Sequence, residues 1–447
     1  MVKQEKDDGL KKIFRMSIIA GIFSQIFNTL SGTGSAFVIK FAIILNASPL
    51  HFSILAAIGQ ISQVFQPIGA LITINRIERK SLVITFRSIG YGIVLFFGIV
   101  PFIFSNENSI IALIILSFFS VSLLSIADNT WIGWIADVIP LRLRGRFFSV
   151  LSQYVLLTSI GAGLIFGFLV DNSGIFSYNT KPFDVEKKHI VFAAIFFIGV
   201  FAAFWGLKVL SRMPEKKKRI EDKYSSEMLF IPFKDGNFRK FLFYNCWWML
   251  AVGIGAPFWQ PFMLQKLHMS LFEVQIYNSI NVIAALLVLR PWGKLIDAYG
   301  NKTAMRLIIT LGGFNPMVWL FVNFYNYHLL YIEAITSGIM WAGAGVVATN
   351  FVLSIAPHES RQLYAGISGA VSGLAMMTTM LISGLFLPQH LKIGDFYLEP
   401  EQVLFAFTGI ARWSTQIPLS LVHESKSKPV TKVITFFINT IKPKFIR

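Results

Sequence analysis

Two charged residues stand inside long apolar stretches of this sequence, where a charge needs a partner or a function. Asp128, which is followed by Asn129 and Thr130, interrupts one stretch, and Arg412 interrupts another. Burial disfavours the charged form of a carboxylate, so Asp128 could bind and release a proton near neutral pH. The alternative for Asp128 is a structural hydrogen bond or ion pair. Arg412 keeps its proton, and it could hold an anionic solute or pair with an acidic neighbour.

A third charge, Arg87, lies near the start of its apolar stretch, so we expect its long side chain to snorkel to the membrane boundary. Uncharged polar side chains also recur in the apolar stretches. We expect some of them to face a hydrated cavity and others to form helix–helix hydrogen bonds. These residues are Gln25, Asn28, Gln60, Gln63, Gln66, Asn245, Gln260, Asn281 and Asn350.

The elements that position these residues must be helices that cross a membrane. Hydrophobic residues make up 54% of the 447 residues and charged residues 14%, with a mean hydropathy of +0.62. Apolar runs of roughly twenty residues span a bilayer as helices, because hydrocarbon offers no partner to a backbone amide. We therefore predict an all-α membrane protein with twelve spans, at residues 16–44, 50–74, 82–104, 109–138, 147–171, 190–211, 241–266, 272–297, 303–325, 328–356, 362–388 and 399–423.

Basic residues gather in alternate loops between these spans. Because basic loops stay on the cytoplasmic side, the pattern predicts a multi-pass protein of the cytoplasmic (inner) membrane with both termini in the cytoplasm. The spread of the +17 net charge over many loops argues against a nucleic-acid partner. The predicted parts are a cytoplasmic N-terminal tail (1–15), a six-helix bundle (16–211), a cytoplasmic linker (212–240), a second six-helix bundle (241–424) and an amphipathic, basic cytoplasmic tail (425–447) that tethers to membrane lipid.

No residue pattern indicates an enzyme, a cofactor or a metal site. The single cysteine, Cys246, can form neither a disulfide nor a thiolate cluster within one chain. The seven histidines are scattered, and a phosphate-binding Gly-x-x-x-x-Gly-Lys-Ser/Thr loop is absent from the sequence. We therefore expect no catalysis and no cofactor.

Short motifs repeat in the two halves of the chain. The end of the second span, Pro67-Ile-Gly69-Ala-Leu71, recurs at the end of the eighth as Pro291-Trp-Gly293-Lys-Leu295. The end of the fourth span carries Pro140 and Arg144 at the spacing at which the end of the tenth carries Pro357 and Arg361. Related halves are typical of transporter folds.

The segment from Gly293 to Lys302, which contains Asp297 and Gly300, resembles the Gly-x-Leu-x-Asp-x-x-Gly-x-Lys/Arg loop of the major facilitator superfamily. In the first half this motif is degraded, since Thr73 replaces its acidic residue and Arg76 its second glycine. A second family motif is matched by Asp137, Pro140, Arg144, Gly145 and Arg146.

The resemblance implies that these loops latch the two halves in one conformation, with Gly69 and Gly293 allowing close helix approach and the acidic residues pairing with basic ones. Topological anchoring by arginine and lysine is the alternative. The residues that the resemblance assigns to the latch are Gly69, Arg76, Arg79, Asp137, Arg144, Arg146, Gly293, Asp297, Gly300, Lys302 and Arg361.

The resemblance also implies that the first, fourth, seventh and tenth helices line a central cavity. The candidate residues for substrate and proton binding on these helices are then Gln25, Asn28, Asp128, Asn129, Asn245, Gln260 and Asn350. Arg412 of the twelfth span is a further candidate because of its charge inside an apolar stretch. Glycines in the seventh span (Gly253-Ile-Gly255-Ala-Pro257) and in the tenth (Gly338, Gly343 and Gly345) predict weakened helices there.

The function that follows is secondary active transport of a small-molecule substrate by alternating access, with a proton as the coupling ion and a monomer as the working unit. The alternative is a membrane sensor or assembly factor that has this fold but does not transport. The degraded loop motif of the first half gives the alternative some support, and uptake into proteoliposomes would distinguish the two.

Overall fold

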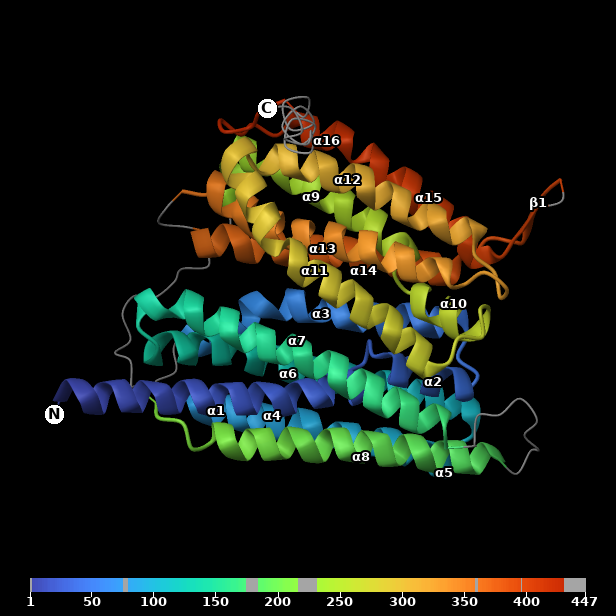
Figure 1. Cartoon of the computed structure of the whole chain (residues 1–447), viewed down its shortest axis with the longest axis horizontal. Helices are drawn as coiled ribbons and strands as arrows, with labels where there is room; N and C mark the ends of the chain where they lie inside the picture. The colour runs from blue at the N-terminus through green and yellow to red at the C-terminus, as the bar shows by residue number, and fades with distance from the viewer. Residues whose placement is uncertain are drawn as a thin grey trace, which may run out of the picture. The chain divides into compact units, whose positions relative to one another are not determined.

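The computed structural model describes residues 2–74, 79–173, 184–215, 231–357, 361–394 and 396–429. Helices dominate, and they follow the apolar runs of the sequence (Figure 1). In chain order the elements are α1 (Val2–Ser31), α2 (Ala36–Ile44), α3 (Pro49–Ile74), α4 (Arg79–Leu95), η1 (Phe96–Gly98), α5 (Val100–Ile103), α6 (Asn106–Val138), α7 (Leu141–Asp171), α8 (Asp184–Leu210), α9 (Gly236–Gly255), α10 (Trp259–Gln265), α11 (Leu271–Tyr299), α12 (Asn301–Val318), η3 (Trp319–Phe321), α13 (Leu329–Ile355), α14 (Arg361–Leu385), β1 (Leu391–Ile393), β2 (Phe396–Leu398), α15 (Pro400–Ser414) and α16 (Gln416–Leu421).

Ten helical stretches in the described residues are long and apolar enough to cross a membrane. The second and twelfth expected spans are helical as well, in α3 and in α15 with α16, but they are not among these ten. The predominantly helical membrane fold is therefore confirmed, and the count of twelve spans stays a prediction. Of the predicted amphipathic tail (425–447), residues 430–447 lie outside the described residues.

Glycines shape the seventh and tenth expected spans in different ways. The seventh breaks as predicted, since α9 ends at Gly255 and α10 begins at Trp259. The prediction for the tenth span is wrong, because α13 runs without interruption from Leu329 to Ile355. Its glycines serve packing instead. A Cβ on Gly343 would lie 2.6 Å from a ring carbon of Trp292, which is mostly buried.

The chain forms two compact units. Unit 1 comprises residues 1–223, 256–278 and 380–387, and unit 2 comprises 224–255, 279–379 and 388–447. Unit 1 thus holds the first six expected spans together with two segments from the second half of the sequence. The predicted division into two six-helix bundles stays a prediction.

Within unit 1, α1 packs along α7 and α8, and α6 packs against α3 and α4. One of the segments from the second half is bound directly to these helices. The Asp171 carboxylate at the end of α7 accepts hydrogen bonds from the backbone N–H groups of Leu271 (3.2 Å) and Phe272 (2.7 Å), so it caps the first turn of α11. Close approach is possible because Gly167 has no side chain, and a Cβ there would lie 3.1 Å from Phe272 Cα.

Unit 2 is organised around a core of buried apolar side chains from α9, α11, α12, α13 and α14. Aromatic rings contribute much of it, as where Phe241 meets Phe351 edge to face with ring centroids 5.1 Å apart. Helix α12 packs against α13 and α15, and α15 packs against α9. These contacts fix the helices that carry Asn245, Asn350 and Arg412.

A short antiparallel hairpin between α14 and α15 departs from the predicted all-helical fold. Strands β1 and β2 pair Leu391 with Leu398 and Lys392 with Tyr397, and Gly394 in the turn has a φ of +60°. Positive φ favours glycine, which has no Cβ to clash with the backbone. The hairpin lies in an expected loop, so the order of the helices is unaffected.

The packing of α13 can be tested with the substitution Gly343→Ala. The added methyl group would displace the Trp292 ring, so we expect the free energy of unfolding to fall by about 1–3 kcal/mol, as for other overpacked cores. Gly345→Ala is the matched control, because nothing lies within 4 Å of a Cβ at that position. Thermal unfolding in detergent should show a lower melting temperature for Gly343→Ala only. Equal melting temperatures for the two variants would contradict this account of α13.

Candidate functional site

A cavity of about 300 Å³ in unit 1 brings together several of the predicted site residues. Gln25 and Asn28 reach it from α1, and Asp128 reaches it from α6. Arg87 and Tyr91 of α4 also line it, and they were not among the predicted site residues. The full lining is Ser17, Ala20, Gly21, Ser24, Gln25, Asn28, Arg87, Tyr91, Leu124, Asp128, Trp131, Ile132, Leu151, Val155 and Leu210.

An ion pair between Arg87 and Asp128 is the strongest polar contact of this cavity. Arg87 Nη2 donates to Asp128 Oδ1 at 2.7 Å, and the guanidinium carbon lies 5.8 Å from the centroid of the Trp131 ring. The Arg87 side chain is 11% exposed, whereas that of Asp128 is 61% exposed. The expectation that Arg87 snorkels to the membrane boundary is therefore wrong. For Asp128 the structure shows the alternative, an ion pair, and its carboxylate is exposed where burial was expected. The negative charge of Asp128 is paired with the more deeply buried guanidinium of Arg87.

The spacing of α4 and α6 explains why the pair forms. Gly90, one turn after Arg87, lies against α6, where a Cβ would be 2.9 Å from Leu124. Ser120 Oγ donates to the Gly90 carbonyl oxygen at 2.9 Å, which also joins the two helices. A larger residue at 90 would separate the helices, so this glycine keeps Arg87 within reach of Asp128.

The other polar groups of the cavity are hydroxyls, side-chain amides and an indole N–H. The hydroxyl groups of Ser24 and Tyr91 lie 3.4 Å apart, and Gln25 Nε2 donates to Thr29 Oγ1 at 3.2 Å. Among the described residues, the buried Trp131 Nε1 and Arg87 Nε have no hydrogen-bond partner. Because one arginine and one aspartate are the only formal charges in the lining, their charges balance. Such a surface can bind a polar solute through hydrogen bonds and an aromatic face.

The remaining predicted cavity residues do not line this cavity. Asn129 donates to the Ser125 carbonyl oxygen of its own helix at 3.1 Å. Gln260 of unit 1 has a buried Oε1 without a partner among the described residues. In unit 2, Asn245 Nδ2 donates to Ser368 Oγ at 3.1 Å, and Asn350 is exposed on α13.

Arg412 joins several helices of unit 2. It is 3% exposed, and its Nη1 donates to the Gly312 carbonyl oxygen at 3.0 Å. Its guanidinium lies 5.9 Å from the ring centroid of Trp248 and 5.7 Å from that of Trp341. These contacts connect α15 with α9, α12 and α13, so in unit 2 Arg412 has a structural role that sequence position alone could not show.

Helix ends in unit 1 contain some of the predicted latch residues. Arg79 Nη1 forms an ion pair with Asp137 Oδ2 at 2.8 Å. Arg144 Nε donates to the Ile139 carbonyl oxygen at 3.1 Å, which ties α7 to the end of α6. The structure adds Glu215, whose Oε1 accepts the backbone N–H groups of Arg79 (2.5 Å) and Lys80 (2.8 Å) at the start of α4.

Unit 2 repeats this arrangement at the start of α12. Glu424 accepts the backbone N–H groups of Asn301 (3.0 Å) and Lys302 (2.7 Å). Lys302 Nζ donates to the Val422 carbonyl oxygen, as Lys80 Nζ donates to that of Met213. In both units a glutamate caps a helix, and the lysine of that helix contacts the residue two positions before the glutamate. Neither glutamate was predicted from the sequence. The available signal was that Lys80 and Lys302 each follow one copy of the repeated Pro-x-Gly-x-Leu segment.

The other predicted latch residues take less part in these contacts. Gly69 lies in α3, and Arg76 is outside the described residues. Arg146 and Asp297 are exposed, and Arg361 is half-buried at the start of α14. Nothing lies within 4 Å of a Cβ on Gly293, so the close approach expected there is not seen. Gly300 has a φ of +90°, and a Cβ there would lie 3.0 Å from Glu424 Oε2. Both features explain why this position holds a glycine.

The cap on α12 can be tested with Glu424→Ala. Two backbone N–H groups would lose their acceptor, so we expect the free energy of unfolding to fall by about 1 kcal/mol. The control is Lys426→Ala, which changes an exposed residue of the same segment. Thermal unfolding should give a lower melting temperature for Glu424→Ala and an unchanged one for the control. An unchanged melting temperature for Glu424→Ala would show that this cap does not stabilise the protein.

The comparisons with known proteins agree with this fold. Residues 241–410 match the family model described as Major Facilitator Superfamily. The crystal structure of the nucleoside transporter NupG aligns with a TM-score of 0.68 at 14% identity, over 91% of this chain and 98% of that one. That of a D-xylose-proton symporter aligns with a TM-score of 0.68 at 14% identity, over 93% and 98%.

An auto-inhibited POT family peptide transporter gives a TM-score of 0.63 at 10% identity, over 92% of this chain and 98% of that one. No curated protein sequence matches the chain. At these identities the structural likeness shows the fold, and the family model adds the sequence signal over the second half. The chain is therefore a multi-pass membrane protein with the fold of these transporter structures, and its residues 241–410 match the model of the Major Facilitator Superfamily.

Proposed function

We propose that the chain is a secondary transporter that moves a small polar solute across a membrane by alternating access, with a proton as the coupling ion. The observation that carries the proposal is the cavity of unit 1, in which a charge pair lies among apolar membrane helices. A charge at that depth costs several kcal/mol unless it is paired, so charged groups inside membranes are usually functional.

Asp128 is the group that we propose for proton binding. Its carboxylate faces the cavity, and its partner Arg87 is largely buried behind it. A proton on Asp128 would neutralise the carboxylate and weaken the contact with Arg87, because the Coulomb attraction between them would be lost. Proton binding and solute binding at the same carboxylate would then be coupled energetically, as a symporter or an antiporter requires.

The helix-end contacts are our candidates for the conformational part of the mechanism. Ion pairs such as Arg79–Asp137 and charged caps such as Glu215 and Glu424 are partly exposed, and contacts of this kind contribute modest energies. A contact of about 1 kcal/mol can be made and broken in each cycle. We propose that these residues stabilise one conformation without preventing the exchange with the other.

The proposed setting is the cytoplasmic membrane, with both termini in the cytoplasm and a monomer as the transporting unit. The basic loops of the sequence support this orientation. The nucleoside, D-xylose and peptide transporters that share the fold suggest which solutes to test first. The balanced charge of the cavity favours members of these classes that carry no net charge.

Transport can be tested in two steps. Uridine, D-xylose and an uncharged-side-chain dipeptide are first screened by thermal shift, because a ligand of the folded state raises the melting temperature. For a compound that raises the melting temperature, uptake into proteoliposomes is then measured in the absence of ATP. We expect saturable uptake that empty liposomes lack. Binding without any flux would favour a sensor with the transporter fold.

The cavity residues can be tested in the same assay with a matched pair of variants. Asn28→Ala removes an amide from the cavity lining, whereas Asn129→Ala removes one that bonds within its own helix. Loss of one hydrogen bond to the solute is worth about 1 kcal/mol, so we expect Asn28→Ala to weaken solute binding roughly fivefold. Asn129→Ala should bind as the unchanged protein does. Equal effects of both variants would place the solute elsewhere.

A further inference from the structure

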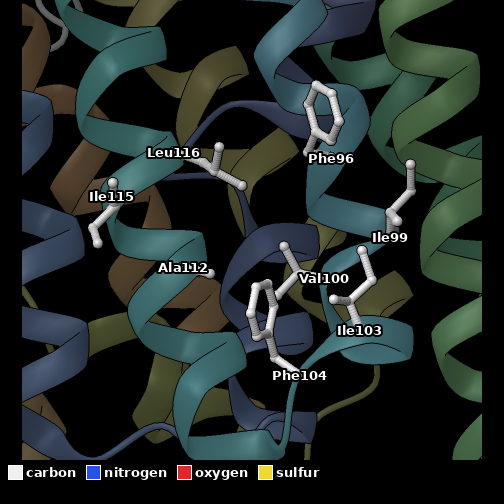
Figure 2. Close-up of a pocket in the computed structure, with 8 residues that line it drawn as sticks. All are labelled: Phe96, Ile99, Val100, Ile103, Phe104, Ala112, Ile115 and Leu116. Atoms are coloured by element: carbon white, nitrogen blue, oxygen red, sulfur yellow. The ribbon is translucent and has the colours of Figure 1, made fainter.

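A second hollow of unit 1, a groove of about 270 Å³, has no lining residue in common with the candidate cavity. It lies where the helix of the third expected span breaks, between η1 with α5 on one side and α6 on the other. Figure 2 shows Phe96, Ile99 and Ile103 on one segment and Ala112, Ile115 and Leu116 on the neighbouring helix α6. The full lining is Phe96, Ile99, Val100, Ile103, Phe104, Ala112, Ile115 and Leu116.

The break that forms this groove is built into the sequence. Gly98 lies against α8, where a Cβ would be 2.6 Å from Ala193 Cα, and Pro101 cannot donate a backbone hydrogen bond within a continuous helix. The chain therefore turns through η1 and α5 before α6 begins. The groove lies between this turn and α6.

The polar backbone groups of the break are satisfied inside the protein. The N–H groups of Ile99, Phe102 and Phe104 donate to carbonyl oxygens within the segment at 3.0 Å each. Ser109 Oγ lies 3.2 Å from the Phe104 carbonyl oxygen and donates to it. All eight lining side chains are hydrocarbon, so the groove offers no hydrogen bond to a solute or to water. Such a surface is compatible only with hydrocarbon.

We propose that this groove binds one acyl chain of a membrane phospholipid. The lining side chains of Phe96, Ile99, Ile103, Phe104 and Ile115 are 44–65% exposed, and they extend the apolar surface of two stretches that can cross a membrane. Bilayer lipid is therefore the solvent of this face. A helix of a second chain is about 10 Å wide, which is too wide for a groove of this volume, whereas a single flexible chain fits.

The test uses a phosphatidylcholine with a photoreactive diazirine in one acyl chain, reconstituted with the full chain, and peptide mapping of the labelled sites. We expect labelling to concentrate on residues 96–116 relative to other exposed apolar faces, such as that of Phe197 and Phe201 on α8. Ala112→Phe fills the groove, and it should lower labelling of this segment about tenfold because hydrocarbon contacts are lost. Ile111→Phe places the same phenyl ring on an exposed neighbour outside the groove and should leave labelling unchanged.

A second variant keeps the test decisive if Ala112→Phe does not fold. Phe104→Ala removes an exposed wall of the groove, so the fold should tolerate it and labelling should fall. Labelling spread evenly over all exposed apolar faces would overturn the proposal. It would show that lipid contacts the whole apolar surface without preference for the groove. Unchanged labelling in a folded Ala112→Phe would overturn it as well.

Discussion

Hydrocarbon offers no hydrogen-bond partner to a polar group. This constraint explains both the long helices of the chain and the pairing of its charged residues. Backbone amides are paired along long helices, and where a helix breaks, as at Gly98 to Phe104, the freed groups bond within the segment. The same constraint applies to charge. Arg87 and Asp128 occur together because either one alone would be costly among the membrane helices.

The ion pair also connects the architecture with the proposed activity. Gly90 lets α4 approach α6, this approach brings Arg87 to Asp128, and the carboxylate faces a cavity with a balanced charge. Charged groups are paired with polar groups at the helix ends as well. Glu215 caps α4 and Glu424 caps α12, and these two helices occupy equivalent positions in the two halves of the sequence. Both features are small polar contacts, which the proposed conformational change requires.

The helical class and the order of the apolar segments could be read from hydropathy alone, because span length is set by the bilayer. The break after Gly255 was also predictable from glycine and proline spacing. Side-chain partners were not: Arg87 looked like a boundary residue until α4 and α6 were placed, and Glu215 and Glu424 lie in polar segments with no periodicity. The continuity of α13 escaped prediction because Gly343 is required by Trp292, a residue far away in the sequence.

The central claim is that Asp128 carries the coupled proton. It is tested most directly by recording solute flux and internal pH together in proteoliposomes that contain a pH-sensitive dye, with a solute that the chain is found to transport. The account predicts that solute movement by the unchanged protein is accompanied by proton movement, and that Asp128→Asn keeps solute exchange but loses the pH change. An equal pH change per solute moved in Asp128→Asn would contradict the account.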